Sequence, residues 1–371
     1  MLDSHLILQW TSHDLMVNYC LKVKPDEKVL LRAHTPAEPL VREINKKIIA
    51  AGGHTFLQLE YPGIEGDVVR FGSDEQIEFI HEPIHLLYST YDCLIRVLAD
   101  DNTHALATVD SDKMTRFAKA RGPLMKTYMD RAASGSLRWV LTAFPTKAFA
   151  QDADMSLEEY EDFVYSACMP DQNDPIGYWQ SISAKQERLV NWLKGKKNVH
   201  LVSKDTDLRL SIEGRTFINC DCKVNVPDGE IFTGPVEESI EGHVSFSYPT
   251  IYNTREVNGV QLDFKKGKVV KASASKNEEF LLKTLDTDEG SRYVGEFAIG
   301  TNEGITKFTR QILFDEKIGG SFHMALGKGY PESGSKAHSA IHWDMICDLR
   351  EGQIWVDDVL FYENGKFVIE G

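Results

Sequence analysis

The chain lacks the features that define several large classes of protein. It contains no apolar run long enough to span a bilayer. Its net charge of -15 at pH 7, without a basic run, argues against a partner with a phosphate backbone. Six scattered cysteines among 371 residues favour reduced thiols over a disulfide framework. The first five residues lack the beginnings of a secretion signal. We therefore expect a cytoplasmic protein that binds neither membranes nor nucleic acid.

A phosphate-binding glycine loop is absent as well. Gly52 and Gly53 follow an amphipathic helical pattern over residues 36–51 and end it, whereas a nucleotide-binding loop opens a helix after a strand. The sequence also shows no repeat and no low-complexity segment. A nucleotide-binding fold therefore receives little support.

Residues 1–200 alternate segments that are typical of strands and of helices. Short apolar runs predict strands at 28–33, 55–59, 93–98 and 137–142. Helical patterns cover 36–51, 75–81, 111–133 with Ser111 as the cap, 154–169 with a capping box from Ser156 to Glu159, and 175–193. Strands separated by helices indicate an α/β domain with a mainly parallel sheet.

From about residue 198 the pattern changes to short strands separated by Gly, Asn and Asp. Two hairpins are predicted, one over 260–273 and one over 359–369 around an Asn-Gly turn, and one helix over 278–285 interrupts the strands. A chain of this length favours two domains. We expect an α/β domain over 1–200 and an α+β domain, dominated by antiparallel strands, over 201–371.

The second half carries polar side chains inside apolar strands. His342 and Asp344 are two residues apart, so on a strand both project from the same face. His323 and Glu296 also interrupt apolar runs. A single histidine in such a run is more often a satisfied core or surface group, and a single glutamate is more often solvated. Their combination is what predicts a metal site, because unpaired polar groups in apolar surroundings are costly.

The candidate ligands are four carboxylates and two imidazoles: Glu230, Glu296, Glu316, His323, His342 and Asp344. They exceed the four ligands of a structural zinc, which favours thiolates. They suit two adjacent cations that share a bridging carboxylate and activate a water molecule. Hydrolysis is the leading interpretation, and the β-rich second domain would carry the site.

Six stretches of the second half carry a family resemblance. They are residues 225–235, 288–296, 313–316, 323–327, 330–331 and 341–344, in that order along the chain. Together they resemble the M29 family of metallo-aminopeptidases over most of residues 205–350. The first half matches more loosely, through its α/β pattern and Phe144-Pro145-Thr146. The spacer between Glu316 and His323 is slightly longer than in the thermophilic enzymes of the family.

The resemblance implies two divalent metal ions per chain, zinc or cobalt, with manganese or magnesium as alternatives. It implies that the six candidate ligands hold them, and that Glu296 bridges them and accepts the proton of the attacking water. Tyr330 would donate to the developing oxyanion. The expected substrates are short peptides with a free N-terminus, and the expected assembly is a homodimer.

Two other functions remain open on the sequence. Some relatives of this fold are ring-cleaving dioxygenases with one ferrous ion, and His323, His342 and Asp344 alone would satisfy their facial triad. Glu230, Glu296 and Glu316 argue against this, because a mononuclear iron site has no use for them. The other alternative is a metal-binding homologue without catalytic activity.

Overall fold

The computed structural model describes residues 13–168 and 174–369, which form two compact units. The first unit comprises Met1–Ile176 and Cys222–Pro227, and the second comprises Gly177–Asp221 and Asp228–Gly371. The start of the chain, from which the absence of a secretion signal was predicted, lies outside the described residues, as does the last residue of the helix predicted over 154–169.

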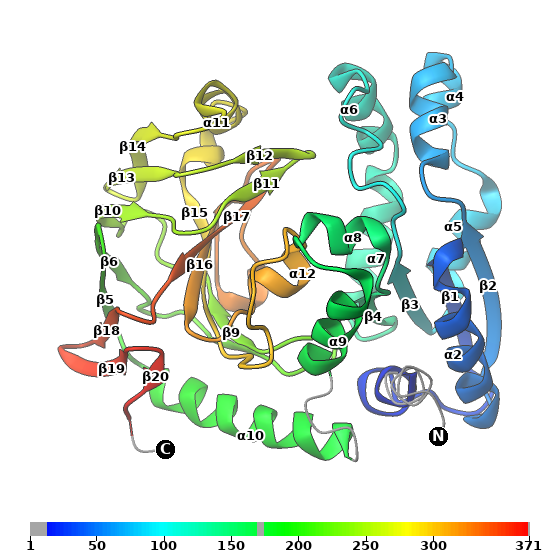
Figure 1. Ribbon diagram of the computed structural model, residues 1–371, viewed down its shortest axis with the longest axis horizontal. Helices are drawn as coiled ribbons and strands as arrows, with labels where there is room; N and C mark the ends of the chain where they lie inside the picture. The colour runs from blue at the N-terminus through cyan, green and yellow to red at the C-terminus, as the bar shows by residue number, and fades with distance from the viewer. Residues whose placement is uncertain (1–12, 169–173, 370–371) are drawn as a thin grey trace. The chain divides into compact units, whose positions relative to one another are not determined.

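The first unit is built on a parallel sheet, as the sequence predicts. Its five strands lie in the order β2-β1-β3-β4-β8, and every described pair is parallel. Their bounds are β1 Lys28–His34, β2 His54–Glu60, β3 Cys93–Leu98, β4 Arg138–Ala143 and β8 Asn225–Val226. Figure 1 shows this sheet among helices. The alternation of strands and helices in the sequence therefore identified the α/β architecture.

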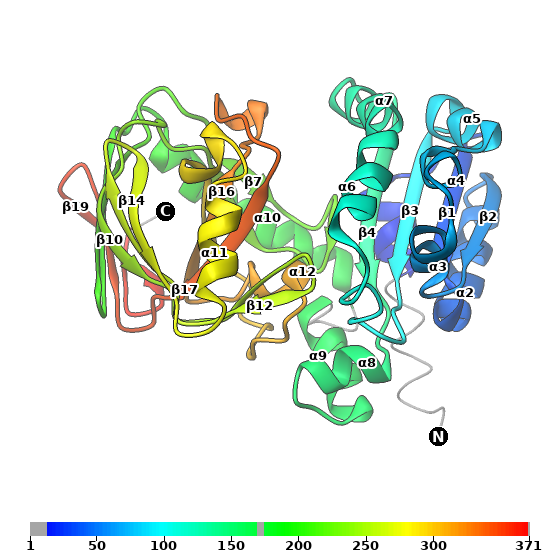
Figure 2. The same cartoon turned by 90° about the horizontal axis from the view of Figure 1, so that it is seen from above.

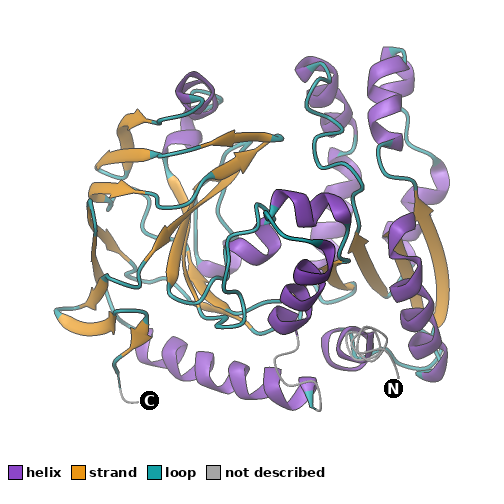
Figure 3. Cartoon of the chain, viewed as in Figure 1, coloured by secondary structure: helices purple, strands orange, loops and turns teal. Residues whose placement is uncertain are grey.

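Helices make up most of the rest of this unit (Figure 3). They are α2 Glu38–Ala50, α3 Ile64–Phe71, α4 Asp74–Glu78, α5 Glu82–Thr90, α6 Ser111–Ala120, α7 Gly122–Ala133, α8 Lys147–Asp152 and α9 Leu157–Cys168, with short helical turns η1 Leu15–Cys20 and η2 Thr35–Ala37. The predicted capping box of α9 is confirmed, since Ser156 and Glu159 exchange backbone-to-side-chain hydrogen bonds.

Two predicted helices differ from those observed. The helix predicted over 111–133 is two helices, because the chain restarts at Gly122 and Pro123 occupies the first turn of α7, where a missing N–H costs nothing. The cap of α6 is the Asp110 carboxylate, which accepts from two backbone N–H groups, and not Ser111. The helix predicted over 75–81 ends at Glu78, and α5 begins at Glu82.

The second unit contains most of the long helix α10 (Pro175–Leu193) and is otherwise dominated by antiparallel strands. One sheet has the order β14-β13-β10-β6-β5-β18-β19-β20, a second has the order β17-β16-β15-β9-β7, and β11 pairs with β12. Figure 2 shows helix α11 (Glu278–Leu285) beside β14 and β12. The short helix α12 (Ile312–Asp315) and the turns η3 Glu289–Arg292 and η4 Pro331–Ser333 complete the unit. This is the antiparallel α+β architecture that the sequence predicts.

The strand bounds of this unit are as follows. The eight-stranded sheet contains β5 Asn198–Ser203, β6 Thr206–Ser211, β10 Glu241–Ser245, β13 Gln261–Lys265, β14 Lys268–Ser273, β18 Gln353–Val356, β19 Val359–Glu363 and β20 Lys366–Phe367. The five-stranded sheet contains β7 Ile218–Cys220, β9 Glu230–Thr233, β15 Val294–Gly300, β16 Ser321–Gly327 and β17 His342–Asp348, and the remaining pair is β11 Thr250–Tyr252 with β12 Arg255–Val257.

Strands β15 and β16 are buried on both faces. One face supplies Val294, Phe297 and the alternate residues of β16 to a large apolar core. A bulge makes this possible, because Val294 pairs with Leu326 while Glu296 pairs with Ala325, which leaves Gly295 as the extra residue. Val294 and Phe297 therefore both enter the core although they are three residues apart, and Glu296 points to the opposite face.

Within residues 13–168 and 174–369, none of the helices combines the length and the hydropathy that crossing a bilayer requires.

Candidate metal centre

Three adjacent strands place four of the candidate ligands on one face of the five-stranded sheet. Glu296 on β15 and Asp344 on β17 both lie opposite Ala325 on β16, so these three residues form a row across the sheet. His323 is two residues from Ala325 on the same strand, and His342 pairs with Gly327 at its end. The alternation of side chains along each strand directs these four polar side chains to one face.

The two imidazoles face the two carboxylates at short range. His323 Nε2 lies 3.5 Å from Glu296 Oε1 and 3.9 Å from Asp344 Oδ1. His342 Nε2 lies 3.5 Å from Glu296 Oε2 and 3.5 Å from Asp344 Oδ1. Glu296 thus has one carboxylate oxygen toward each ring. The sequence-predicted residues Glu296, His323, His342 and Asp344 converge at one point.

Backbone carbonyls fix the orientation of both rings. His323 Nδ1 is 3.0 Å from the carbonyl oxygen of Glu316, and His342 Nδ1 is 2.7 Å from that of Lys328. A carbonyl only accepts, so each Nδ1 carries the proton and donates it. In a neutral ring Nε2 is then left with a free lone pair that points at the carboxylates. Histidine ligands in metalloproteins are held in this way.

Glu230 and Glu316 lie on another side of the same cluster, where a lysine separates them. Glu230 Oε2 is 3.7 Å from His323 Nδ1, while Glu230 Oε1 is 3.8 Å from the ammonium of Lys317. Lys317 also donates a hydrogen bond to the Glu316 carboxylate. Glu316 therefore accepts two hydrogen bonds in this region: its backbone carbonyl accepts one from His323, and its carboxylate accepts one from Lys317.

Burial and mutual charge shift the titration of the whole cluster. Burial alone lowers the pKa of His323, but its contact with Glu296 and the charge of Glu230 outweigh this and raise the pKa to about 10. For His342 the charge of Asp344 likewise outweighs burial and raises the pKa to about 10. Burial raises the pKa of Glu230 and of Glu296. For Asp344 the nearby imidazoles outweigh burial and lower the pKa.

These residues fit a divalent metal ion. Among the residues that the structure describes, no group forms a hydrogen bond with the buried atoms Glu230 Oε2 and Asp344 Oδ1, which is costly unless something else binds them. Ligand atoms of Glu296, His323 and Asp344 all lie within 4.8 Å of one another, with His342 adjacent. Imidazole nitrogen and carboxylate oxygen are the donors that zinc and its neighbours in the transition series accept.

Tyr330 lies beside the cluster. Its ring packs edge-on against the His342 ring, with centroids 5.3 Å apart, and against Phe232 at 5.5 Å. Burial, followed by the negative charges of Glu296 and Asp344, raises the pKa of the phenol. Tyr330 is therefore protonated at neutral pH and can donate a hydrogen bond beside His342, one of the candidate metal ligands.

Sequence reasoning missed three residues of this region. Lys317 reads as a surface residue because it follows Asp315 and Glu316, yet its side chain is 0% exposed. Cys220 and Asp228 form a second group with Glu230, with ligand atoms within 4.8 Å of one another. Asp228 stands two residues from Glu230 in the sequence, just before β9, and this short spacing was an available signal. No pattern in the sequence linked Cys220 to that pair.

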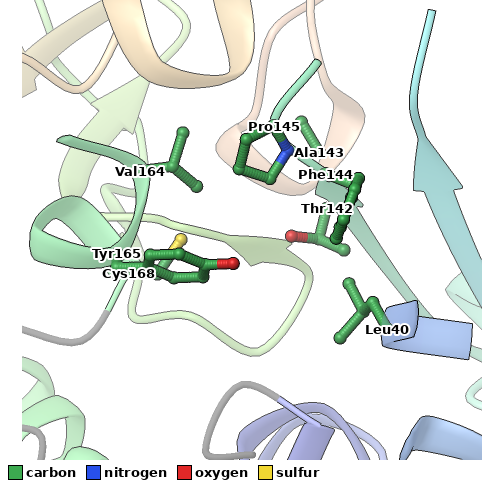
Figure 4. Close-up of a pocket in the computed structure, with 8 residues that line it drawn as sticks. All are labelled: Leu40, Thr142, Ala143, Phe144, Pro145, Val164, Tyr165 and Cys168. Atoms are coloured by element: carbon green, nitrogen blue, oxygen red, sulfur yellow. The ribbon is translucent and has the colours of Figure 1, made fainter. Parts of the chain in front are cut away.

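The first unit contains a separate, mostly apolar pocket at the carboxyl end of β4. It is lined by Leu40, Thr142, Ala143, Phe144, Pro145, Val164, Tyr165 and Cys168 (Figure 4). The Thr142 hydroxyl donates to the Val226 carbonyl, and burial raises the pKa of the Cys168 thiol. The loosely matched motif Phe144-Pro145 therefore forms one wall of this pocket, which offers no set of metal ligands.

Curated proteins similar to this chain are aminopeptidases. Aminopeptidase 2 of Geobacillus stearothermophilus is 27% identical over 345 residues, which covers 86% of this chain and 83% of that protein. Aminopeptidase T of Thermus thermophilus is 25% identical over 345 residues, which covers 86% of this chain and 84% of that protein.

A solved structure and a family model extend the similarity to nearly the whole chain. The structure of wild-type AmpT from Thermus thermophilus superposes with a TM-score of 0.84 at 22% identity and covers 98% of this chain and 99% of that one, which shows a shared fold. The model of the family described as thermophilic metalloprotease (M29) matches residues 12–367. The chain therefore belongs to the M29 metalloprotease family.

Proposed function

We propose that this protein is a metal-dependent aminopeptidase that releases N-terminal amino acids from peptides with a water molecule activated by two metal ions. One observation carries the proposal: two imidazoles, each held by a backbone carbonyl, turn Nε2 toward the same two buried carboxylates. Membership of a metalloprotease family and the aminopeptidase names of the relatives support it.

The proposed ligands are Glu230, Glu296, Glu316, His323, His342 and Asp344. When bound, the metal ions would supply Lewis acidity to a water molecule and to the peptide carbonyl. Glu296 is the proposed bridging ligand because both of its carboxylate oxygens face the cluster. The remaining steps fall to the side chains of the chain itself.

Glu296 is also the proposed proton acceptor. It is 5% exposed and its carboxylate lies within 3.5 Å of both imidazoles, so it is placed beside the proposed water to accept its proton. Tyr330 is the proposed donor to the oxygen of the tetrahedral intermediate, because its phenol stays protonated beside His342. The carboxylates of the cluster offer partners for the free α-amine of a substrate. An internal peptide bond has no such amine, which would restrict cleavage to the N-terminal residue.

The first test replaces Glu296. We expect Glu296→Gln to lower the turnover of an aminoacyl-anilide by about 10²–10⁴-fold, because the amide cannot accept the proton. The circular dichroism spectrum should not change. Glu303→Gln, on the exposed surface of the same unit, is the matched control and should retain full turnover. Unchanged turnover in Glu296→Gln would remove the role assigned to this residue.

The second test changes the substrate. Acetylation of the substrate amine should abolish cleavage, because the blocked amine carries no charge for the carboxylates to bind. Release of free amino acid and of blocked amino acid would be measured by mass spectrometry on paired peptides. Equal cleavage of both peptides would identify an enzyme that is not an aminopeptidase.

The proposal includes a homodimer, for which apolar side chains on the surface of the first unit are suitable. Phe71, Phe79 and Leu86 are 82%, 58% and 60% exposed. Sedimentation at micromolar concentration would test it, and a monomer would refute it.

A ring-cleaving dioxygenase is not favoured. Glu296 lies between the two imidazoles and Glu230 beside one of them, whereas a facial triad needs only one carboxylate. Anaerobic turnover of an aminoacyl-anilide would distinguish the two activities.

A further inference from the structure

Lys317 is a lysine without solvent access inside the candidate metal centre. It lies two residues after the end of α12, and its side chain is 0% exposed. Its backbone is fixed on both sides, since its N–H donates to the Phe314 carbonyl and its own carbonyl accepts from Asn302 N–H. Lysines are almost never fully buried unless they are paired. The position is therefore built for a positive charge.

The ammonium of Lys317 joins two of the proposed metal ligands. It donates to the Glu316 carboxylate and lies 3.8 Å from Glu230 Oε1. A metal ion bound to these carboxylates would sit about 2.0–2.2 Å from their oxygens. It would then share with the ammonium the space between the same two side chains. Like charges at that range in a buried site repel strongly.

The other part of the cluster is arranged differently. The described ion pairs of Glu296 and Asp344 are with His323 and His342, whose protons can leave when a metal binds. No ammonium stands in that group of ion pairs within the described residues. The two parts of the centre therefore offer a cation very different surroundings.

We propose that Lys317 is a resident cation of the centre that makes the two metal ions bind unequally. The first ion binds to Glu296, His323, His342 and Asp344. The second ion binds only when the Lys317 ammonium gives up Glu230 and Glu316, which its flexible stem permits. When the supply of metal is limiting, each chain carries one ion, and the Lys317 ammonium occupies the second metal site. This inference rests on the metal site of the proposed function but not on its catalytic activity.

Metal titration of the full chain tests the inference. Protein stripped with a chelator is titrated with Zn²⁺ in an isothermal calorimeter, and bound metal is counted by elemental analysis after dialysis. For the wild type we expect two steps whose dissociation constants differ by at least about tenfold. Lys317→Met keeps the length of the stem and removes the charge, and it should tighten the second step by about tenfold or more without loosening the first. Lys204→Met, at an exposed lysine of the same unit, is the matched control and should resemble the wild type.

Several results would overturn the inference. The inference would fall if the two dissociation constants of the wild type were equal. It would also fall if the second dissociation constant of Lys317→Met matched that of Lys204→Met. Should Lys317→Met fail to fold, Lys317→Gln and the wild-type titration carry the test by the same criteria. Aminoacyl-anilide turnover is measured on the same samples. The two dissociation constants could be unequal in the wild type and similar in Lys317→Met while no sample turns over the anilide. That result would refute the proposed activity and uphold the role of Lys317.

Discussion

Thr250 offers a sharp test of which contacts support the strand that carries the candidate ligands His342 and Asp344. Its hydroxyl accepts a hydrogen bond from Trp343 Nε1–H at 2.6 Å and donates one to the backbone carbonyl of Asp344 at 2.6 Å. Thr250 is 5% exposed and Trp343 is 1% exposed, so water cannot replace either bond. Trp343 lies between His342 and Asp344 on β17, and this hydroxyl therefore fixes the strand that carries both.

Thr250→Val removes the hydroxyl while it keeps the shape and the β-branched character that a strand favours. The indole N–H is then buried without a partner, which costs about 1–3 kcal/mol, and the loss of the bond to the Asp344 carbonyl adds about 1 kcal/mol. We expect the free energy of unfolding to fall by about 2–4 kcal/mol. For a unit of about 150–250 residues this lowers Tm by roughly 4–16 °C.

Calorimetric melting of the metal-free protein measures this change, and Thr250→Ser is the control because it keeps the hydroxyl. If the proposed ligands hold the metal, its affinity should also fall by about tenfold in Thr250→Val, as is typical when a hydrogen bond that orients a ligand is lost. A Val variant that melts with the Ser variant would refute the reasoning that this hydroxyl supports β17.

Two further predictions concern backbone space and pH. A Cβ at position 295 would lie 2.5 Å from the backbone of Lys328, so Gly295→Ala should destabilise the second unit by about 2 kcal/mol or more. The control is Gly122→Ala, whose added Cβ meets no atom within 4 Å. Urea unfolding compares the two variants, and equal stability would contradict the packing argument. His13 is 2% exposed, and burial, followed by the charge of Lys47, lowers its pKa to about 4. The unfolded chain then binds more protons than the folded one between about pH 6.5 and pH 4. The contribution of neutral His13 to the free energy of unfolding is therefore complete above about pH 6.5 and is lost as the pH falls. After allowance for screening, the loss of unfolding free energy is roughly 1–2 kcal/mol by pH 5. The His13→Gln variant should show a shallower decrease in unfolding free energy with falling pH than the wild type. Parallel pH profiles of the two proteins would exclude His13 as the cause.

The sequence predicted the architecture where a local pattern is sufficient. The parallel strands β1 to β4 are short apolar runs, and the turn at Asn364 and Gly365 closes the last hairpin as expected. The patterns failed where one helix follows another directly. Pro83 and Pro123 start new helices in the first turn, a use of proline that the periodicity of apolar residues does not reveal.

The candidate site was predictable in part for a physical reason. His323, Glu296 and the His342–Asp344 pair stand out because polar groups inside apolar strands need a partner. The position of Lys317 could not be predicted this way, since a lysine beside two acids in sequence is typical of solvated surface. Its burial depends on contacts with Glu230 and Asn302, which are distant from it along the chain. The ligand roles of all six residues, and a domain boundary near residue 200, stay predictions.

The bulge at Gly295 has a consequence for how this site tolerates change. Side chains of a strand alternate with a period of two, so an insertion or deletion of one residue reverses which face each of them occupies. A deletion within residues 294–296 would direct the Glu296 carboxylate into the layer that holds Phe297 and Met324, or else expel an apolar group from it. Length variation at this point should therefore be far more harmful than most single replacements nearby, and natural or engineered variants that remain active should conserve the number of residues here even where they exchange their identity.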